Sequence, residues 1–201
     1  MKIASHQPYF FPYIGYFSLI AAVDTFIFFD ISQLNRQGWM TRNRILRPDD
    51  EWQYIHAKTQ YLPVNGLLSD CLLIEGTEWK DKILAQLEHY KKKASFYQET
   101  IEFIVELLYQ PETHLADFNI KSTVAIARKL SIETTIYRYA DIIAKVDKAA
   151  RGNLWGLSFC KAFGGDTYIN APGGVGLYTV DDYHHAGIKL GFIQHHLSPY
   201  A

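Results

Sequence analysis

The hydrophobic and polar positions of the first thirty residues predict a strand, a loop, a helix and a second strand. Residues 1–5 have the pattern of a short strand, and residues 25–29 form a compact β-branched and aromatic run. Between them, Pro12 can open a helix over residues 13–22, because the missing proline N–H would be unpaired in a first turn anyway. This length and order indicate a βαβ crossover.

The rest of the chain continues the alternation of strands and helices. Helical spacing of apolar residues predicts helices over 78–108 with a break at 91–95, over 114–130, over 148–163 and over 179–186. Thr77 is the expected N-cap of the first of these helices, and Gly164-Gly165 the stop of the third. Further strands are predicted at residues 67–74, 132–137, 166–170 and 188–193.

A hairpin over residues 39–58 interrupts this alternation, with its turn at Arg47-Pro48-Asp49-Asp50. The whole pattern favours an α/β fold of the Rossmann-like (HUP-like) kind, a mostly parallel sheet flanked by helices. The hairpin is then an insertion, and residues 78–130 form a helical section. We expect one domain over residues 1–201, with the section 78–130 as a candidate subdomain.

Composition narrows the class of protein further. Twenty Lys and Arg against 21 Asp and Glu leave a net charge of −1, so no global field favours nucleic acid or anionic lipid. Cys71 and Cys160 are isolated thiols, which is typical of a reduced compartment. The longest apolar run, residues 14–29, contains Ser18 and Asp24 and lacks the marks of a signal peptide. We therefore expect a cytoplasmic protein with no membrane span.

Polar residues at strand ends are the candidates for chemistry. Carboxyl ends of parallel strands meet at one edge of an open α/β sheet, where ligands bind. The strands predicted here end at His6, Asp30, Asn170 and Gln194, which we expect at that edge. An imidazole at His6 can act as general acid or base, with Asp30 orienting it or holding a substrate amine. The alternative is that both side chains pair with loop backbone.

Several of these residues carry a family resemblance. The stretch His6-Gln7-Pro8-Tyr9, with the later Asp30, Arg36 and Asn43, resembles the opening of the WbqC-like family, associated with bacterial O-antigen and surface-polysaccharide biosynthesis. The likeness continues at Asn119, at 168–174 and at 187–188, and so covers nearly the whole chain. The family's closing aromatic and proline-containing motif continues for some residues beyond a stretch like 196–200, whereas this chain ends at Ala201.

The resemblance implies a transferase that moves an acyl or aminoacyl group onto a nucleotide-linked amino sugar. His6 would take a proton from the attacking amine, and Asp30 would hold that amine. Arg36 and Arg42 would bind the diphosphate, and backbone amides of the glycine-rich loop 171–176 would meet oxyanion charge. The remaining expected substrate-binding residues are Gln7, Tyr9, Tyr16, Asn43, Asn119, Asn170, Gly173 and Gly174.

Each of these assignments has a structural alternative. The arginines can form a solvated face of the hairpin, and the glycines can form a plain turn. Asn119 can be a helix residue with local hydrogen bonds, and the aromatic residues 9–13 can fill the core as a plug beneath the first loop. The histidine pairs 184–185 and 195–196 lack the spacing of a metal site, so no metal ligand is predicted, and the sequence leaves open the identity of any cofactor and whether a metal is used. The sequence does not identify the sugar, the donor or the oligomeric state.

Two other function classes remain open. A weaker likeness to nucleotidyltransferases of the HUP type places Pro12 and Gly15 comparably, but Tyr13 and Tyr16 stand where histidines would meet phosphate. Phenols with an ordinary pKa near ~10 cannot supply that positive charge. The third class is a non-catalytic protein that binds a nucleotide sugar.

Overall fold

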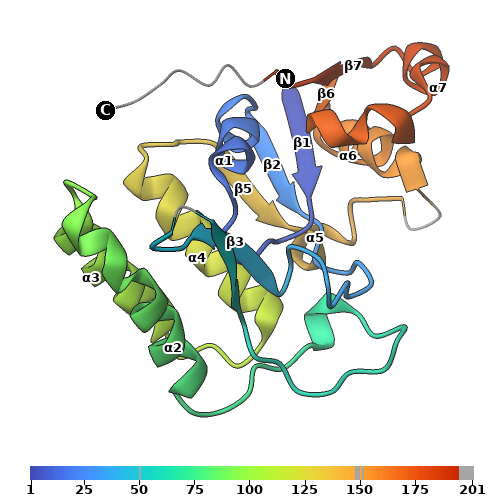
Figure 1. Ribbon diagram of the computed structural model, residues 1–201. Helices are drawn as coiled ribbons and strands as arrows, with labels where there is room; N and C mark the ends of the chain where they lie inside the picture. The colour runs from blue at the N-terminus through green and yellow to red at the C-terminus, as the bar shows by residue number, and fades with distance from the viewer. Residues whose placement is uncertain (50, 148–149, 151, 195–201) are drawn as a thin grey trace. The chain divides into compact units, whose positions relative to one another are not determined.

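The computed structural model describes residues 1–49, 51–147, 150 and 152–194, and it confirms an α/β, Rossmann-like fold (Figure 1). The strands are β1 (Lys2–His6), β2 (Thr25–Phe28), β3 (Arg42–Leu46), β4 (Trp52–His56), β5 (Thr135–Arg138), β6 (Thr167–Asn170) and β7 (Lys189–Phe192). The α-helices are α1 (Ile14–Ala21), α2 (Glu78–Leu87), α3 (Tyr97–Leu108), α4 (Leu115–Lys129), α5 (Tyr139–Ile142), α6 (Trp155–Phe163) and α7 (Val180–His185). Short 3₁₀ segments are η1 (Leu68–Asp70), η2 (Glu88–Lys92), η3 (Gly152–Leu154) and η4 (Pro172–Leu177).

Five parallel strands form the main sheet in the order β5-β2-β1-β6-β7. From β1 the chain adds β2 and then β5 on one side, and it then crosses over to add β6 and β7 on the other. The strand order therefore reverses between β1 and β6, which is the switch point of a doubly wound sheet. All four residues of β2 are buried, as expected for a strand covered on both faces.

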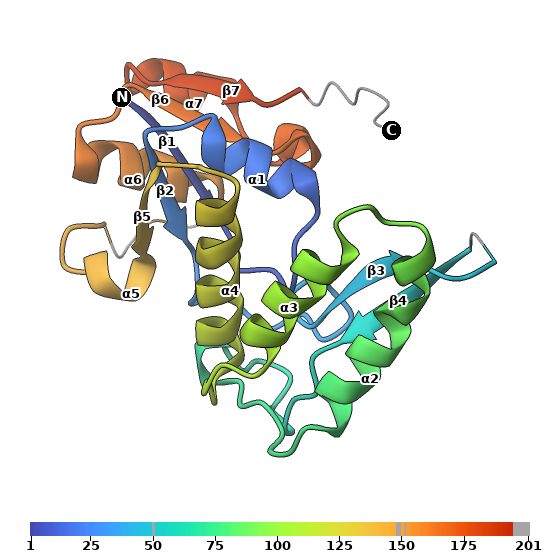
Figure 2. The same ribbon diagram turned by 90° about the vertical axis from the view of Figure 1, so that its left-hand side faces the viewer.

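The helices of the sheet lie on two faces, which adjacent residues of β1 distinguish. Ser5 bonds to the hydroxyl of Tyr168, whose ring stacks on Tyr183 of α7. The next residue, His6, contacts Tyr16 of α1. Because successive side chains of a strand point to opposite faces, α1 and α7 cover opposite faces. In Figure 2, α1 and α6 likewise lie on opposite sides of the strands.

The chain divides into two compact units. The sheet unit contains Met1–Gln7, Tyr13–Asp30 and Val124–Ala201, and the hairpin unit contains Pro8–Pro12 and Ile31–Thr123. The boundary between the two units falls inside α4, between Thr123 and Val124, and the loop 8–12 belongs to the hairpin unit. One domain over 1–201 stays a prediction, and the hairpin unit is larger than the expected subdomain 78–130.

The hairpin unit has a hydrophobic core of its own, built from segments far apart in the sequence. Antiparallel β3 and β4 pair from Arg42 with His56 to Leu46 with Trp52, so the expected hairpin is confirmed. In Figure 2, α2 and α3 lie beside this hairpin. The buried core residues are Phe10, Leu34, Met40, Ile55, Ala57, Leu68, Cys71, Leu73, Trp79, Ile83, Leu108, Leu115, Ala116 and Phe118.

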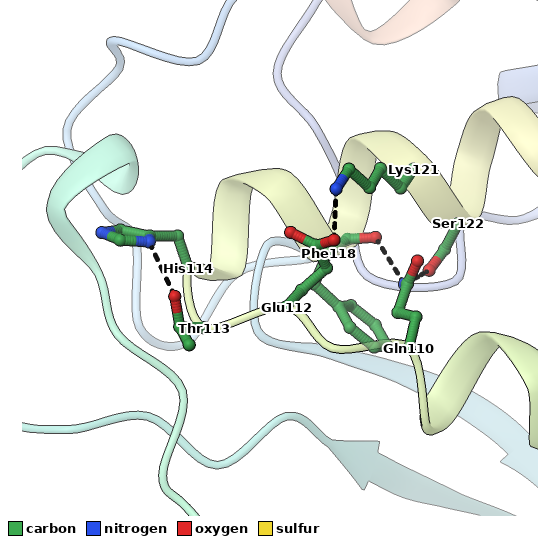
Figure 3. Close-up of polar contacts among 7 residues, drawn as sticks. All are labelled: Gln110, Glu112, Thr113, His114, Phe118, Lys121 and Ser122. Carbon is green, nitrogen blue, oxygen red and sulfur yellow. Dashed lines mark hydrogen bonds and ion pairs between the residues drawn. The ribbon is translucent and has the colours of Figure 1, made fainter.

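Polar contacts fix the turn between α3 and α4 (Figure 3). Gln110 donates to Ser122 Oγ at 2.8 Å and to the Phe118 carbonyl at 3.4 Å. Lys121 forms an ion pair with Glu112. These contacts tie the connection to α4, where Phe118 and Ser122 are buried.

The predicted strand over residues 67–74 is wrong. Residues 68–70 form the 3₁₀ turn η1, and isolated bridges join Leu67 to Gln33, Leu73 to Thr59 and Leu72 to His114. The segment buries Leu68, Cys71 and Leu73 as its apolar pattern requires. Its backbone groups, however, bond to several separate segments, so no ladder with one partner strand develops.

Other boundaries differ in smaller ways. The prediction for residues 148–163 is confirmed over 155–163, whereas 148–149 and 151 lie outside the described residues, as does the histidine pair 195–196. As expected, α6 ends at Gly164, whose φ of +70° is left-handed. Thr77 does precede α2, but its hydroxyl donates to Asp81 at 2.7 Å and does not cap a backbone N–H.

Gly156 is the glycine at which packing leaves least room. A Cβ there would lie 2.3 Å from the hydroxyl oxygen of Tyr183 and 2.6 Å from the ring of buried Tyr168. We expect Gly156→Ala to lower the free energy of unfolding by about 1–3 kcal/mol in urea, measured by circular dichroism. The control Gly176→Ala meets no atom within 4 Å and should change it by less than about 0.5 kcal/mol. Equal stability of the two variants would contradict this packing.

Candidate functional site

His6 occupies the carboxyl end of β1, at the switch point of the sheet. Its Nδ1 lies 3.2 Å from the carbonyl oxygen of Gln7, and the Tyr16 hydroxyl donates to the same oxygen at 2.9 Å. Since a carbonyl only accepts, this bond requires a proton on Nδ1, and the neutral ring then carries its lone pair on Nε2. Burial lowers the pKa of His6, against a smaller opposing effect of the Gln7 bond. The geometry thus favours a neutral imidazole with a basic Nε2.

A row of side chains extends from His6 across the carboxyl ends of β2 and β5. His6 is in register with Phe28, and Phe28 with Arg138, so all three side chains share one face. Two strand spacings of about 4.8 Å place the backbones of His6 and Arg138 roughly 10 Å apart. Phe28 therefore separates the imidazole from the guanidinium.

Asp30 joins this row through an ion pair with Arg138. The carboxylate of Asp30 is fully buried, and Arg138 Nε donates to its Oδ2. The other oxygen, Oδ1, is buried without a hydrogen-bond partner in the described part of the chain. An unsatisfied carboxylate oxygen costs free energy, so Asp30 Oδ1 is suited to accept a ligand N–H or O–H.

Asn170 lies on the opposite face of the sheet from His6. It follows Tyr168 by two residues in β6, and Tyr168 bonds to Ser5, not to the His6 side. The amide of Asn170 donates to the Tyr178 hydroxyl and its oxygen accepts from the Ala171 N–H. These bonds hold the start of η4, so Asn170 has a structural task, and its substrate-binding role stays a prediction.

The glycine-rich loop forms the 3₁₀ segment η4 and not a plain turn. Neither Gly173 nor Gly174 has a positive φ. Gly174 is needed for close approach, since a Cβ would lie 3.2 Å from the Asn170 amide nitrogen. Its N–H donates to the Ala171 carbonyl at 3.0 Å. Of the two amides expected to meet an oxyanion, that of Gly174 is therefore already used within the turn.

The loop 8–12 is anchored by the hairpin unit, although it follows His6 and Gln7 directly. Asn119 of α4 is fully buried and donates to the carbonyls of Pro8, at 3.1 Å, and Met40, at 2.9 Å. Asn43 of β3 donates to the carbonyls of Phe10 and Phe11. Both asparagines thus satisfy buried backbone acceptors, which is what buried polar side chains commonly do.

The aromatic residues of the same loop differ in exposure. Phe10 is fully buried and stacks on Phe118 with 5.7 Å between ring centroids. Tyr9 packs partly buried against the hairpin core, and Tyr13 is 53% exposed. Phe11 has a φ of +43°, a left-handed conformation that is strained for an aromatic residue. The alternative of a core plug therefore applies to Phe10, and a substrate-binding role for Tyr9 stays a prediction.

Arg36 and Arg42, which we expected to bind a diphosphate, contact different groups within the hairpin unit. Arg36 donates to the Leu62 carbonyl and lies over the ring of Tyr61. Arg42 lies 4.2 Å over the ring of Tyr54, with its Nε buried and unpaired in the described residues. A shared site of these arginines with His6 stays a prediction.

Comparison with known proteins identifies the family. The model of the WbqC-like protein family matches residues 7–201. The chain belongs to the WbqC-like protein family. It is also 29% identical over 180 residues to an uncharacterized protein of Mycobacterium tuberculosis (strain ATCC 25618 / H37Rv), covering 85% of this chain and 72% of that protein. No solved structure matches.

Two further features of this WbqC-like protein bear on its function. In residues 1–49, 51–147, 150 and 152–194, no helix is long and apolar enough to cross a membrane. Within the same ranges, no three His, Cys, Asp or Glu side chains are grouped so that they could hold a metal ion.

Sequence reasoning missed Arg138, which pairs with the buried Asp30 of this WbqC-like protein. The signal was present, because Arg138 is the polar residue that ends the β-rich run 132–137, just as His6 ends the first strand. Only the pairing of β5 beside β2 puts it next to Asp30. The sequence does not reveal that neighbour.

Removing Arg138 should leave a buried carboxylate without its counter-ion. We expect Arg138→Gln to lower the free energy of unfolding by about 2–4 kcal/mol in urea denaturation. Adding Asp30→Asn to this variant should recover part of the loss, because the unpaired charge is removed. The control Arg128→Gln changes an exposed arginine of α4 and should cost under about 0.5 kcal/mol. Additive effects at positions 30 and 138 would contradict the pair.

Asn119 should be needed mainly for the fold of the hairpin unit. Asn119→Ala leaves the buried carbonyls of Pro8 and Met40 without donors, so we expect about 2–4 kcal/mol less stability toward urea. Asn35 is an exposed turn residue, and Asn35→Ala should cost about 1 kcal/mol or less. An Asn119→Ala protein as stable as the parent would show that these two bonds are not important.

Proposed function

We propose that this protein is a transferase of bacterial surface-polysaccharide biosynthesis that moves an acyl or aminoacyl group onto a nucleotide-linked amino sugar, with His6 as general base. The observation that carries this proposal is the setting of His6 at the switch point, with Nδ1 held on the Gln7 carbonyl and a lowered pKa. Membership of the WbqC-like family supports the biosynthetic setting.

The chemistry requires a base that is neutral near pH 7. In the proposed reaction, the sugar amine attacks the carbonyl carbon of the donor while Nε2 of His6 takes a proton from the amine. A C–N bond forms, the bond from the carbonyl carbon to the donor's leaving group breaks, and the proton passes from His6 to that leaving group. Lowering the pKa of His6 keeps Nε2 able to accept a proton at neutral pH.

Asp30 would hold the reacting amine through the oxygen that Arg138 does not use. Its Oδ1 is a buried acceptor without a partner in the described residues, whereas its Oδ2 is paired with Arg138. A hydrogen bond from the amine N–H to Oδ1 would give this oxygen a partner and would orient the amine nitrogen. The ion pair with Arg138 supports a charged carboxylate in this role. In this proposal Arg138 is a positioning residue, because it acts through Asp30.

The strand order also supports a second candidate, ATP-dependent nucleotidyl or adenylyl transfer of the HUP type. Two residues weigh against it. Tyr16 replaces one expected imidazole, and its hydroxyl already donates to the Gln7 carbonyl. Tyr13 replaces the other and is 53% exposed. Neither phenol supplies positive charge to a phosphate.

Calorimetry separates these functions. UDP-, dTDP- and GDP-linked amino sugars are titrated into the protein, and candidate acyl donors are then added while product is followed by mass spectrometry. We expect one nucleotide sugar to bind and to be acylated. Pyrophosphate release from ATP with a carboxylic acid would favour the second candidate. Binding without turnover with any donor would favour a non-catalytic binder, and absence of binding across the panel would refute the proposed substrate class.

The protonation of His6 gives a prediction that needs no substrate. Because burial lowers its pKa, we expect its NMR titration midpoint below 6.5, the value of an unperturbed histidine. Between these two pH values the unfolded chain binds more protons than the folded one, so stability should fall as pH falls through that window. His6→Gln should abolish this contribution, and His184→Gln, at an exposed position of α7, should retain it. A midpoint at or above 6.5 would contradict the lowering of the His6 pKa by burial.

In the acyl-transfer assay, His6→Gln should lower the rate by about 10²–10⁴-fold while sugar-nucleotide binding is kept within a few-fold. His184→Gln should leave both unchanged. The rate of the parent protein should decline as pH falls through the measured His6 midpoint, since the protonated ring cannot act as a base. A His6→Gln protein with full turnover would remove His6 from the mechanism.

A further inference from the structure

The hairpin unit contains a cavity of about 610 Å³ that the proposed function does not use. Small-molecule sites commonly have volumes of about 300–1,000 Å³, so this one can hold a ligand of nucleotide size. Its walls come from the hairpin turn, from the 3₁₀ segment η2 and from the first turns of α3. We call it the lysine pocket, and its lining residues are Pro48, Glu88, His89, Lys91, Lys92, Lys93, Tyr97, Gln98 and Ile101.

The lining of the lysine pocket is strongly cationic for a protein whose net charge is −1. Three lysines face one carboxylate, that of Glu88, which leaves an excess of two positive charges before His89 is counted. The three lysines are consecutive at the end of η2, yet all of them line the same cavity.

The amino end of α3 adds to this positive field. Tyr97 and Gln98 are the first two residues of this twelve-residue helix, and both line the pocket. The first N–H groups of a helix carry partial positive charge and commonly bind phosphate. The helix end and the lysines thus favour the same kind of ligand.

His89 is a fixed polar side chain in the lining of the pocket. Its Nδ1 lies 3.0 Å from the Gln86 carbonyl and so carries a proton, and its ring lies 4.2 Å from that of Tyr90, centroid to centroid. These contacts fix the ring, whereas its Nε2 is buried and has no hydrogen-bond partner in the described residues. The His89 ring is thus fixed within the lining, and among the described residues its Nε2 lacks the hydrogen-bond partner that buried polar atoms usually have.

The lining of the pocket also includes apolar residues. Pro48, Tyr97 and Ile101 contribute to it together with the lysines. Such residues can take the flat or aliphatic part of a molecule whose anionic part meets the lysines. Inorganic phosphate alone would leave these residues unused.

We propose that the lysine pocket binds a phosphate-bearing small molecule, with Lys91 and Lys92 pairing with its phosphate groups and the His89 ring, protonated on both nitrogens in the complex, donating a hydrogen bond from Nε2 to the same anionic end. Lysine ammonium groups bind phosphate as point charges with three donors each. This site goes beyond the proposed transferase function, because none of its residues takes part in the His6 chemistry.

Titration calorimetry at low ionic strength tests the site with three probes: ADP, inorganic pyrophosphate and adenosine. We expect ADP to bind most tightly, because it meets both the lysines and the apolar residues. Pyrophosphate should bind more weakly, and adenosine, which lacks phosphate, should not bind measurably. Adenosine binding as well as ADP would overturn the proposal, as would the absence of ADP binding.

Charge-matched variants distinguish the pocket from general electrostatics. Lys91→Gln with Lys92→Gln should weaken ADP binding by at least about tenfold, the equivalent of 1.4 kcal/mol. The control pair Lys2→Gln with Lys189→Gln removes two exposed charges of the sheet unit and should change affinity by less than about twofold. Equal losses in the two pairs would refute a specific site.

His89→Asn tests the imidazole while keeping a donor near the position of Nδ1 for the Gln86 carbonyl. We expect this variant to keep its melting temperature and to bind ADP several-fold more weakly. The pair Lys91→Arg with Lys92→Arg keeps the charge and should retain most of the affinity, which guards against loss by misfolding. In the parent protein, the NMR signals of the His89 ring should shift on addition of ADP, and a ring unaffected at saturation would contradict its contact with the ligand.

Discussion

Parallel pairing of β1 with strands on both of its sides is the constraint on which the sheet unit depends. β2 lies on one side and β6 on the other, although more than a hundred residues separate those strands in the sequence. Because the chain first builds away from β1 in one direction and then in the other, the loops after β1 and β6 diverge at its carboxyl end. His6 occupies that end. Its chemistry is thus a consequence of strand order, and its ring is then fixed by the Gln7 carbonyl and by Tyr16 of α1.

A second feature of this structure is that side chains donate hydrogen bonds to buried backbone carbonyls. The loop 8–12 contains two prolines, which donate no hydrogen bond, and its carbonyls still need donors. Asn119 and Asn43 supply them from α4 and β3, and Phe10 fills the hairpin core. A polar residue that looks like a ligand contact in the sequence can therefore be one that holds the backbone. The same applies to Asn170, whose amide holds the start of η4.

Charge in this protein is organised locally. Its net charge is close to zero, yet Asp30 is fully buried against Arg138, and three lysines line one cavity. The exposed face of the hairpin is a further cationic region, where Arg42 and Arg44 lie over aromatic rings. There, Arg42 with Lys58 and Lys82 adds to the effect of burial in lowering the pKa of His56. Local fields of this kind act over about a Debye length, so overall charge says little about what each site binds.

The sequence by itself determined the elements and the sheet-edge residues of this protein. Period-two and helical patterns are local properties of the chain, so they predicted the parallel sheet, the hairpin and most helices, and polar residues at strand ends marked His6 and Asp30. Tertiary structure alone decided which residues meet. The register of the parallel strands placed Arg138 beside Asp30 and directed the side chain of Asn170 to the opposite face of the sheet from His6. Packing of the hairpin core gave residues 67–74 an irregular backbone. The pairings of Arg138 with Asp30 and of Tyr168 with Ser5 join residues over a hundred positions apart, and their energy comes from burial and partners that no local pattern encodes.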